Sequence, residues 1–135
     1  MAESVMTELV RRAGRENEFE IDSAATSREE IGNPPHRGTV HKLREVGIPV
    51  VPHRARQIRA EEFEQWDVIA YMDSENLRGL RRIFGADVLE AAMRDGKVVP
   101  LLADRDVADP WYTGDFDATY RDILAGCTDL LSRLK

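Results

Sequence analysis

The sequence predicts an α/β fold with a parallel sheet, and two observations carry this prediction. Residues 68–72, Val-Ile-Ala-Tyr-Met, form a continuous apolar run typical of a parallel strand that is covered on both faces. Residues 98–102 form a second, shorter run, and helical patterns lie between the two. Because parallel strands need a crossover connection, strands that alternate with helices indicate the α/β class. With 135 residues, 42% of them hydrophobic, we expect residues 1–135 to form a single domain.

The first third of the chain predicts two helices with an extended segment between them. In residues 2–13, apolar positions recur at helical spacing, and Gly14 follows as a stop signal. In residues 18–24, apolar and acidic side chains alternate, which predicts an edge strand. After the polar loop 25–32, Asn33 is the expected cap of a helix with Pro34 and Pro35 in its first turn, and Gly47 ends that helix.

The middle of the chain carries the clearest strand and the helices around it. Residues 48–52 contain two prolines, which remove ladder donors and favour an extended connector. A short amphipathic helix at 60–66 precedes the strand 68–72. Ser74 is the expected cap of a helix that runs to about Phe84, and 88–93 add a further helical piece.

The last third supplies an edge strand, a loop and the most regular helix. Pro100 fits the strand 98–102 at a sheet edge, where its missing N–H costs nothing. Apolar side chains recur at helical spacing over residues 115–134. Since ligands of such sheets bind beyond the carboxyl ends of the strands, we expect Ser23, Asp73 and Asp109 to converge there.

The loop Asp109-Pro110-Trp111-Tyr112 is the main candidate for chemistry. A carboxyl group held beside aromatic rings can retain a proton for a leaving oxygen, because partial burial favours the neutral acid. Read alone, the same residues also fit an Asp-Pro turn whose aromatics cover a core edge. The remaining motifs decide between these readings.

Charge and cysteine content exclude several classes of function. The net charge of −6 disfavours nucleic acid and anionic membranes as partners, since both attract positive surface. The single cysteine, Cys127, shares the apolar face of the last helix and predicts a structural role in a reducing cytoplasm. His36 and His41 have no further ligand at convincing spacing, so we expect no metal site.

Five motifs, in this order and spacing, resemble the low-molecular-weight protein tyrosine phosphatases over essentially the whole chain. They are 21–27 (Ile-Asp-Ser-Ala-Ala-Thr-Ser), 31–35 (Ile-Gly-Asn-Pro-Pro), 53–57 (His-Arg-Ala-Arg-Gln), 72–77 (Met-Asp-Ser-Glu-Asn-Leu) and 109–112 (Asp-Pro-Trp-Tyr). The resemblance implies a three-layer α/β/α fold with a four-stranded parallel sheet and no cofactor. It implies a substrate that is a phosphotyrosine protein or a small aryl phosphate.

The resemblance also assigns roles. Asp109 resembles the general acid, Trp111 and Tyr112 resemble the aromatic wall against which the substrate ring packs, and Ser23 and His53 resemble the residues that support the phosphate loop. The family's Cys-x5-Arg-Ser loop and first strand have no counterpart before Met1. We therefore expect a truncated, inactive form, or else a non-catalytic remnant that acts as a binding module. The loss of a strand would expose sheet edges through which copies of the chain could associate.

Overall fold

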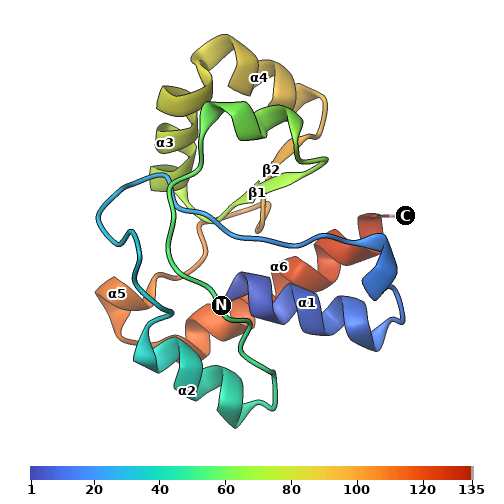
Figure 1. Cartoon of the computed structure of the whole chain (residues 1–135), viewed down its shortest axis with the longest axis vertical. Coiled ribbons are helices and arrows are strands. Elements are labelled where there is room, and N and C mark those ends of the chain that lie inside the picture. The colour runs from blue at the N-terminus through green and yellow to red at the C-terminus, as the bar shows by residue number, and fades with distance from the viewer. Residues whose placement is uncertain (135) are drawn as a thin grey trace. The chain divides into compact units, whose positions relative to one another are not determined.

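The computed structural model describes residues 1–134, apart from the side chains of Trp111 and Tyr112. The described residues form two compact units (Figure 1). The helical unit comprises Met1–Ser23, Asn33–Arg54 and Val107–Lys135, and the sheet unit comprises Ala24–Gly32 and Ala55–Asp106. No helix in the described part of the chain has both the length and the apolar character that crossing a membrane requires. The prediction of a single domain remains a prediction.

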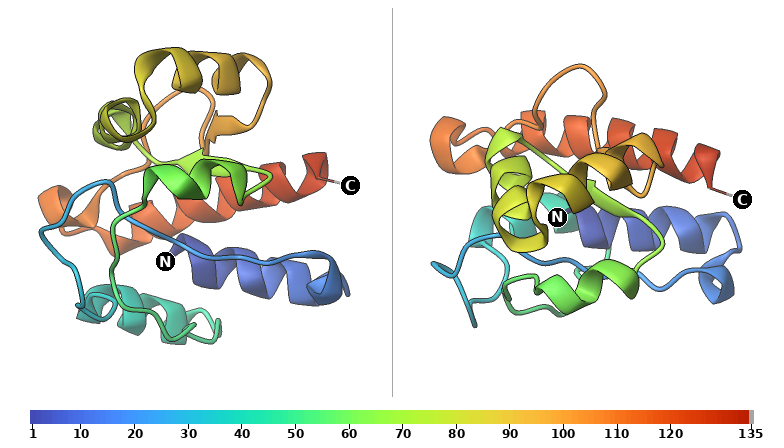
Figure 2. Two further views of the ribbon diagram at one scale, coloured as in Figure 1. Left: turned by 45° about the horizontal axis from the view of Figure 1, so that its top comes forward. Right: turned by 90° about the horizontal axis from the view of Figure 1, so that it is seen from above.

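The helical unit is built on two long helices. Helix α1 (Ala2–Arg12) packs against α6 (Phe116–Arg133), and α2 (Arg37–Glu45) also packs against α6 (Figure 2). A 3-10 turn, η1 (Glu16–Glu18), follows α1, and the short helix α5 (Pro110–Thr113) precedes α6. The core is apolar and includes Val5, Val10, Leu43, Ile123 and Cys127.

Helix α2 begins three residues later than the sequence predicts. We expected Asn33 to be its cap, but the cap is His36, whose Nδ1 accepts a hydrogen bond from the backbone N–H of Gly38 at 2.9 Å. The reason is steric, because a residue that precedes proline avoids helical torsions, and this holds Asn33 and Pro34 extended. The His36 ring also stacks on Phe116 with a centroid separation of 5.4 Å.

The sheet unit holds two parallel strands. Strand β1 (Ile69–Tyr71) pairs with β2 (Val98–Pro100), with Ile69 opposite Val98. Helices α3 (Ser74–Phe84) and α4 (Ala86–Arg94) connect the strands, and the 3-10 turn η2 (Ala60–Glu64) stands where we expected a short α-helix. The buried cluster is Ile58, Leu80, Leu89, Ala92 and Val98.

Two further predictions need correction. Asp73, and not Ser74, caps α3, since its side chain accepts the N–H of Asn76 at 2.8 Å. Residues 18–24, where we expected a strand, have none: Glu18 ends the 3-10 turn η1, and the bridge nearest to residues 19–24 pairs Ala25 with Gln57. Alternating polarity predicts extended backbone, but a strand also needs a neighbour to bond with, which the pattern cannot reveal. Of the four strands expected for the family, the described residues form two.

Gly79, inside α3, is expected to resist replacement by alanine. Alanine is favoured over glycine by about 1 kcal/mol in helix interiors. A Cβ at this buried position would, however, overlap the side chain of Thr26. We expect Gly79→Ala to lower the free energy of unfolding by about 1–3 kcal/mol, measured by urea denaturation.

Thr26→Gly supplies the control, because it removes the side chain that alanine would meet. The loss caused by Gly79→Ala should largely disappear in the Thr26→Gly background, as expected of residues in contact. If Gly79→Ala instead raises the free energy of unfolding, α3 does not approach Thr26 as closely as the structure shows.

Candidate functional site

Asp109 lies in the segment of the helical unit that leads into α5. Its carbonyl accepts the N–H of Thr113 at 3.2 Å, and the carbonyl of Pro110 accepts the N–H of Gly114 at 2.7 Å. The Asp109 side chain is half-buried. The turn therefore fixes the backbone on the carboxyl side of Asp109, as the Asp-Pro pair predicts.

The predicted aromatic wall can be placed only through its backbone. Trp111 and Tyr112 belong to helix α5, but their side chains lie outside the described residues. Their assignment to the substrate ring stays a prediction. Asp73, the third residue we expected at the same end of the sheet, belongs to the sheet unit and caps α3 there. Its convergence with Ser23 and Asp109 also stays a prediction.

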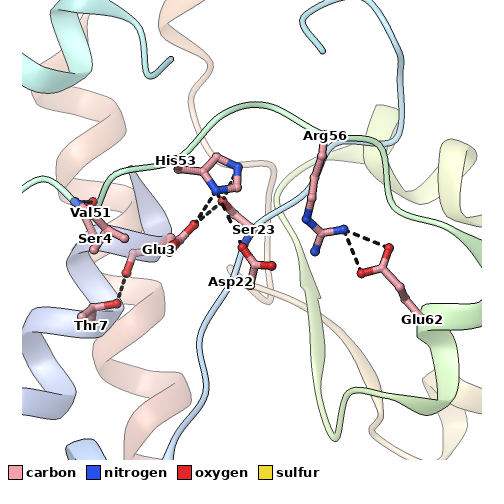
Figure 3. A network of polar contacts seen from close by, with 9 residues as sticks. All are labelled: Glu3, Ser4, Thr7, Asp22, Ser23, Val51, His53, Arg56 and Glu62. Carbon is pink, nitrogen blue, oxygen red and sulfur yellow. Dashed lines mark hydrogen bonds and ion pairs between the residues drawn. The ribbon is translucent and has the colours of Figure 1, made fainter. Parts of the chain in front are cut away.

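The structure brings Ser23 and His53 together, although 30 positions separate them in the sequence (Figure 3). Ser23 Oγ lies 3.3 Å from His53 Nε2 and donates a hydrogen bond of 2.6 Å to Glu3 Oε1. His53 Nδ1 lies 3.3 Å from the same Glu3 oxygen and 3.7 Å from Asp22 Oδ1. We call Glu3, Asp22, Ser23 and His53 the carboxylate–histidine network. It holds three distant segments at one point.

Two members of this network, Glu3 and Asp22, escaped the sequence analysis. Glu3 stands in the first turn of α1, with its side chain only 10% exposed, and Asp22 also accepts the backbone N–H of Ser23 at 2.8 Å. An acidic residue in a first helical turn is ordinarily explained by the helix dipole alone. Only the adjacency of Asp22 to Ser23 could have signalled a shared role.

The same network contains the group of described residues whose geometry could hold a metal ion. Donor atoms of Glu3, Asp22 and His53 all lie within 4.8 Å of one another. Each of the three already makes hydrogen bonds or ion pairs inside the network. These contacts account for the cluster without a metal, and the absence of a metal in the chemistry remains a prediction.

His53 also borders an open hollow of about 440 Å³ in the helical unit. The other lining residues are Pro34, Pro35, Pro52 and Arg54. Three proline rings therefore line this hollow together with His53 and Arg54.

Cys127 cannot act as a nucleophile in the folded chain. It is 2% exposed, and burial raises the pKa of its thiol to about 12, so the thiolate is almost absent at neutral pH. Its Sγ lies 4.0 Å from the carbonyl oxygen of Ala2 on the facing helix. The predicted structural role fits this position.

Cys127 and Arg133 happen to have the Cys-x5-Arg spacing of a phosphate loop. Both lie on the continuous helix α6, where backbone N–H groups bond within the helix and cannot converge on an anion. Arg133 forms an exposed ion pair of 3.1 Å with Asp129. The spacing therefore does not make a phosphate site.

A thiol reagent should distinguish a structural cysteine from a reactive one. We expect Cys127 to react with an aromatic disulfide at pH 7 at least about a hundredfold more slowly in the folded chain than in urea, because burial limits both access and ionisation. Absorbance of the released thiolate measures both rates. Equal rates in the two states would contradict the burial of Cys127.

Comparison with known proteins supplies the context for these residues. Residues 1–135 match the family described as "Low molecular weight phosphotyrosine protein phosphatase". A low molecular weight protein-tyrosine-phosphatase of Bacillus subtilis, YfkJ, is 34% identical over 138 residues, which cover 100% of this chain and 86% of the relative. A low molecular weight phosphotyrosine protein phosphatase of Gallus gallus is 34% identical over 142 residues, covering 98% and 85%.

Solved structures agree with the sequence comparison. The crystal structure of Bacillus subtilis YfkJ matches with a TM-score of 0.84 at 34% identity, over 97% of this chain and 82% of that one. The phosphatase SP-PTP from Streptococcus pyogenes matches with a TM-score of 0.82 at 36% identity, over 99% and 83%. These likenesses confirm the predicted three-layer α/β/α class.

Proposed function

Since the chain belongs to the low molecular weight phosphotyrosine protein phosphatase family, we propose that it supplies the general acid and the supporting residues of a phosphatase. The substrates would be phosphotyrosine proteins or small aryl phosphate monoesters. The observation that carries this proposal is the family match over all 135 residues, with Asp109 at the head of α5.

The proposed reaction has two steps and needs no cofactor. A cysteine thiolate attacks phosphorus, the bond from phosphorus to the phenolic oxygen breaks, and Asp109 gives its proton to that oxygen. The Asp109 carboxylate then takes a proton from water, whose oxygen attacks the cysteinyl phosphate and releases phosphate and the thiolate. Asp109 is thereby returned to its acid form.

Other residues have supporting roles in this proposal. Trp111 and Tyr112 would flank the aromatic ring of the substrate. Ser23 and His53, which lie 3.3 Å apart, would hold the phosphate loop in shape. Their existing bonds to Glu3 and Asp22 would keep both side chains in one orientation.

The thiolate would have to come from a Cys-x5-Arg-Ser loop, and the 135 residues contain none. Cys127 is too deeply buried and too weak an acid to replace it. We therefore propose that these 135 residues alone do not turn over substrate. A second candidate function, a non-catalytic binding module, is favoured by the same lack of an accessible thiolate.

Charge and compartment complete the proposal. With a net charge of −6, neither nucleic acid nor an anionic membrane is expected to bind, and the free thiol of Cys127 suits the cytoplasm. We expect copies of the chain to associate if strand edges stay unpaired, because exposed backbone donors and acceptors favour pairing with another strand. A concentration-dependent sedimentation coefficient would support this association.

The test is to supply what the 135 residues lack. The loop-extended chain is defined as residues 1–135 preceded by a strand and a Cys-x5-Arg-Ser loop designed from the family pattern. We expect it to hydrolyse p-nitrophenyl phosphate, and we expect the loop Cys→Ser variant to be inactive. A folded loop-extended chain that binds phosphate without hydrolysing the ester would favour the binding module.

A further inference from the structure

Ala108, the residue before Asp109, has both of its backbone polar groups bound by side chains of α6. Its N–H donates a hydrogen bond of 2.9 Å to Asp122 Oδ2. Its carbonyl oxygen accepts a hydrogen bond of 2.7 Å from Thr119 Oγ1. Two side chains of α6 therefore hold the two peptide groups that flank the Cα atom of Ala108.

The two side chains are deeply buried and share one face of the helix. Thr119 is 4% exposed and Asp122 is 8% exposed, and their spacing of three residues places them side by side on α6. A hydrogen bond from a backbone N–H to a carboxylate is charge-assisted and stronger than a neutral one. Loss of either side chain would leave a backbone group of Ala108 without its partner.

The chain on the other side of Asp109 is restrained independently. Proline at 110 restricts the backbone of Asp109 to extended torsions. The carbonyl of Asp109 accepts the N–H of Thr113. On the N-terminal side of Asp109, Val107 is buried, with 6% of its surface exposed. The backbone is therefore held on both sides of Asp109.

We infer that Thr119 and Asp122 are positioning residues for the proton donor Asp109. A misplacement of about 1 Å at a reacting group can cost about a hundredfold in rate, so fixing the peptide before the acid has a direct catalytic value. This inference rests on the proposed function only for the role of Asp109 as acid. The two hydrogen bonds from α6 to Ala108 are observed in the structure and do not depend on the proposed function.

The first test uses amide hydrogen exchange of the 135-residue chain, followed by NMR. Asp122→Ala should speed exchange at the Ala108 amide by at least about tenfold, whereas Asp122→Asn, which keeps an acceptor oxygen, should retain most of the protection. Asp129→Ala is the matched control, because Asp129 is an exposed aspartate of the same helix. It should leave the Ala108 amide unchanged.

Thr119 provides a second, nearly isosteric test in case Asp122→Ala does not fold. Thr119→Val removes the donor to the Ala108 carbonyl and should shift the Asp109 amide resonance, whereas Thr119→Ser should restore its position. Thr128→Val, at an exposed position of α6, should leave the Asp109 amide resonance unmoved. Unchanged exchange at Ala108 and an unmoved Asp109 resonance in every variant would overturn the inference.

The effect of Thr119 and Asp122 on catalysis is tested in the loop-extended chain. If Thr119 and Asp122 act through the acid, Asp122→Ala should lower kcat/KM for phenyl phosphate, whose leaving group needs a proton, more than kcat/KM for p-nitrophenyl phosphate. Asp122→Asn should restore the kcat/KM ratio of the two substrates to that of the parent chain. Equal losses of kcat/KM on both esters would overturn the positioning role, whereas an inactive parent chain would instead count against the proposed function.

Discussion

The loop-extended chain is expected to lose about 10²–10⁴-fold in kcat/KM, which reports the step that expels the leaving group, for phenyl phosphate when Asp109 is replaced by Asn. The amide of Asn cannot give up a proton to the phenolate oxygen, which is basic enough to need one as it leaves. The loss should be smaller for p-nitrophenyl phosphate, because p-nitrophenolate is a weak base and leaves without full protonation. Steady-state kinetics on the two esters measures the difference.

Asp104→Asn is the matched control for this experiment. Asp104 is an exposed aspartate five residues before Asp109, and its replacement should change kcat/KM for neither ester. A loss of kcat/KM in Asp109→Asn that is equal for both esters would show that Asp109 does not protonate the leaving group. The acid would then have to be sought elsewhere in the chain.

A large loss of stability is expected when Glu62, in the sheet unit, is replaced. Its side chain is 4% exposed, and it accepts hydrogen bonds from Arg56 Nη1 at 2.8 and 2.9 Å (Figure 3). It also accepts one from the backbone N–H of Arg59 at 2.8 Å. Removing one partner of a buried ion pair costs about 3–5 kcal/mol. Because Arg56 is one-third exposed, we expect about 2–3 kcal/mol for Glu62→Ala.

The pH dependence of stability should change in the same variant. Burial alone would raise the pKa of Glu62, but the N–H of Arg59 and the guanidinium of Arg56 outweigh it and lower the pKa below its ordinary value of 4.5. Its contribution is therefore complete above that value and is lost as the pH falls through the lowered pKa. Glu62→Ala should flatten the acid side of the stability curve.

Two comparisons make the Glu62 result specific. Glu61→Ala, next to it but exposed, should change stability by no more than about 0.5 kcal/mol. Some acid dependence should persist, because Arg11 and Arg12 hold the pKa of Glu8 at about 2. Urea denaturation between pH 3 and pH 7 measures all three chains. An acid limb unchanged in Glu62→Ala would contradict the buried pair.

Helices were predicted better than strands, and the physical reason is locality. The apolar spacing of residues 115–134 predicted a helix that the structure places at Phe116–Arg133. Residues 19–24, in contrast, show the alternation of a strand without forming one. A helix satisfies its backbone within its own segment, whereas a strand depends on a neighbour that the local pattern does not specify.

In the candidate site, too, some residues were predicted from the sequence and others were missed. Ser23 and His53 were paired through the family resemblance, and the structure places them 3.3 Å apart. Glu3 was missed because its contact with Ser23 spans 20 positions of sequence, and no periodicity connects them. Asp122 had no predicted role, although its carboxylate accepts the backbone N–H of Ala108, the residue before Asp109.

The most direct test of the proposal is p-nitrophenyl phosphate hydrolysis by the purified 135-residue chain, with Asp109→Ala and Cys127→Ser variants alongside. In the proposed mechanism Asp109 would protonate the leaving group, but Cys127, the single cysteine, is buried, so we predict no release of p-nitrophenol above the uncatalysed rate from any of the three. Release by the parent chain that disappears in Asp109→Ala or Cys127→Ser would contradict this, and would show that these residues complete a catalytic centre by themselves.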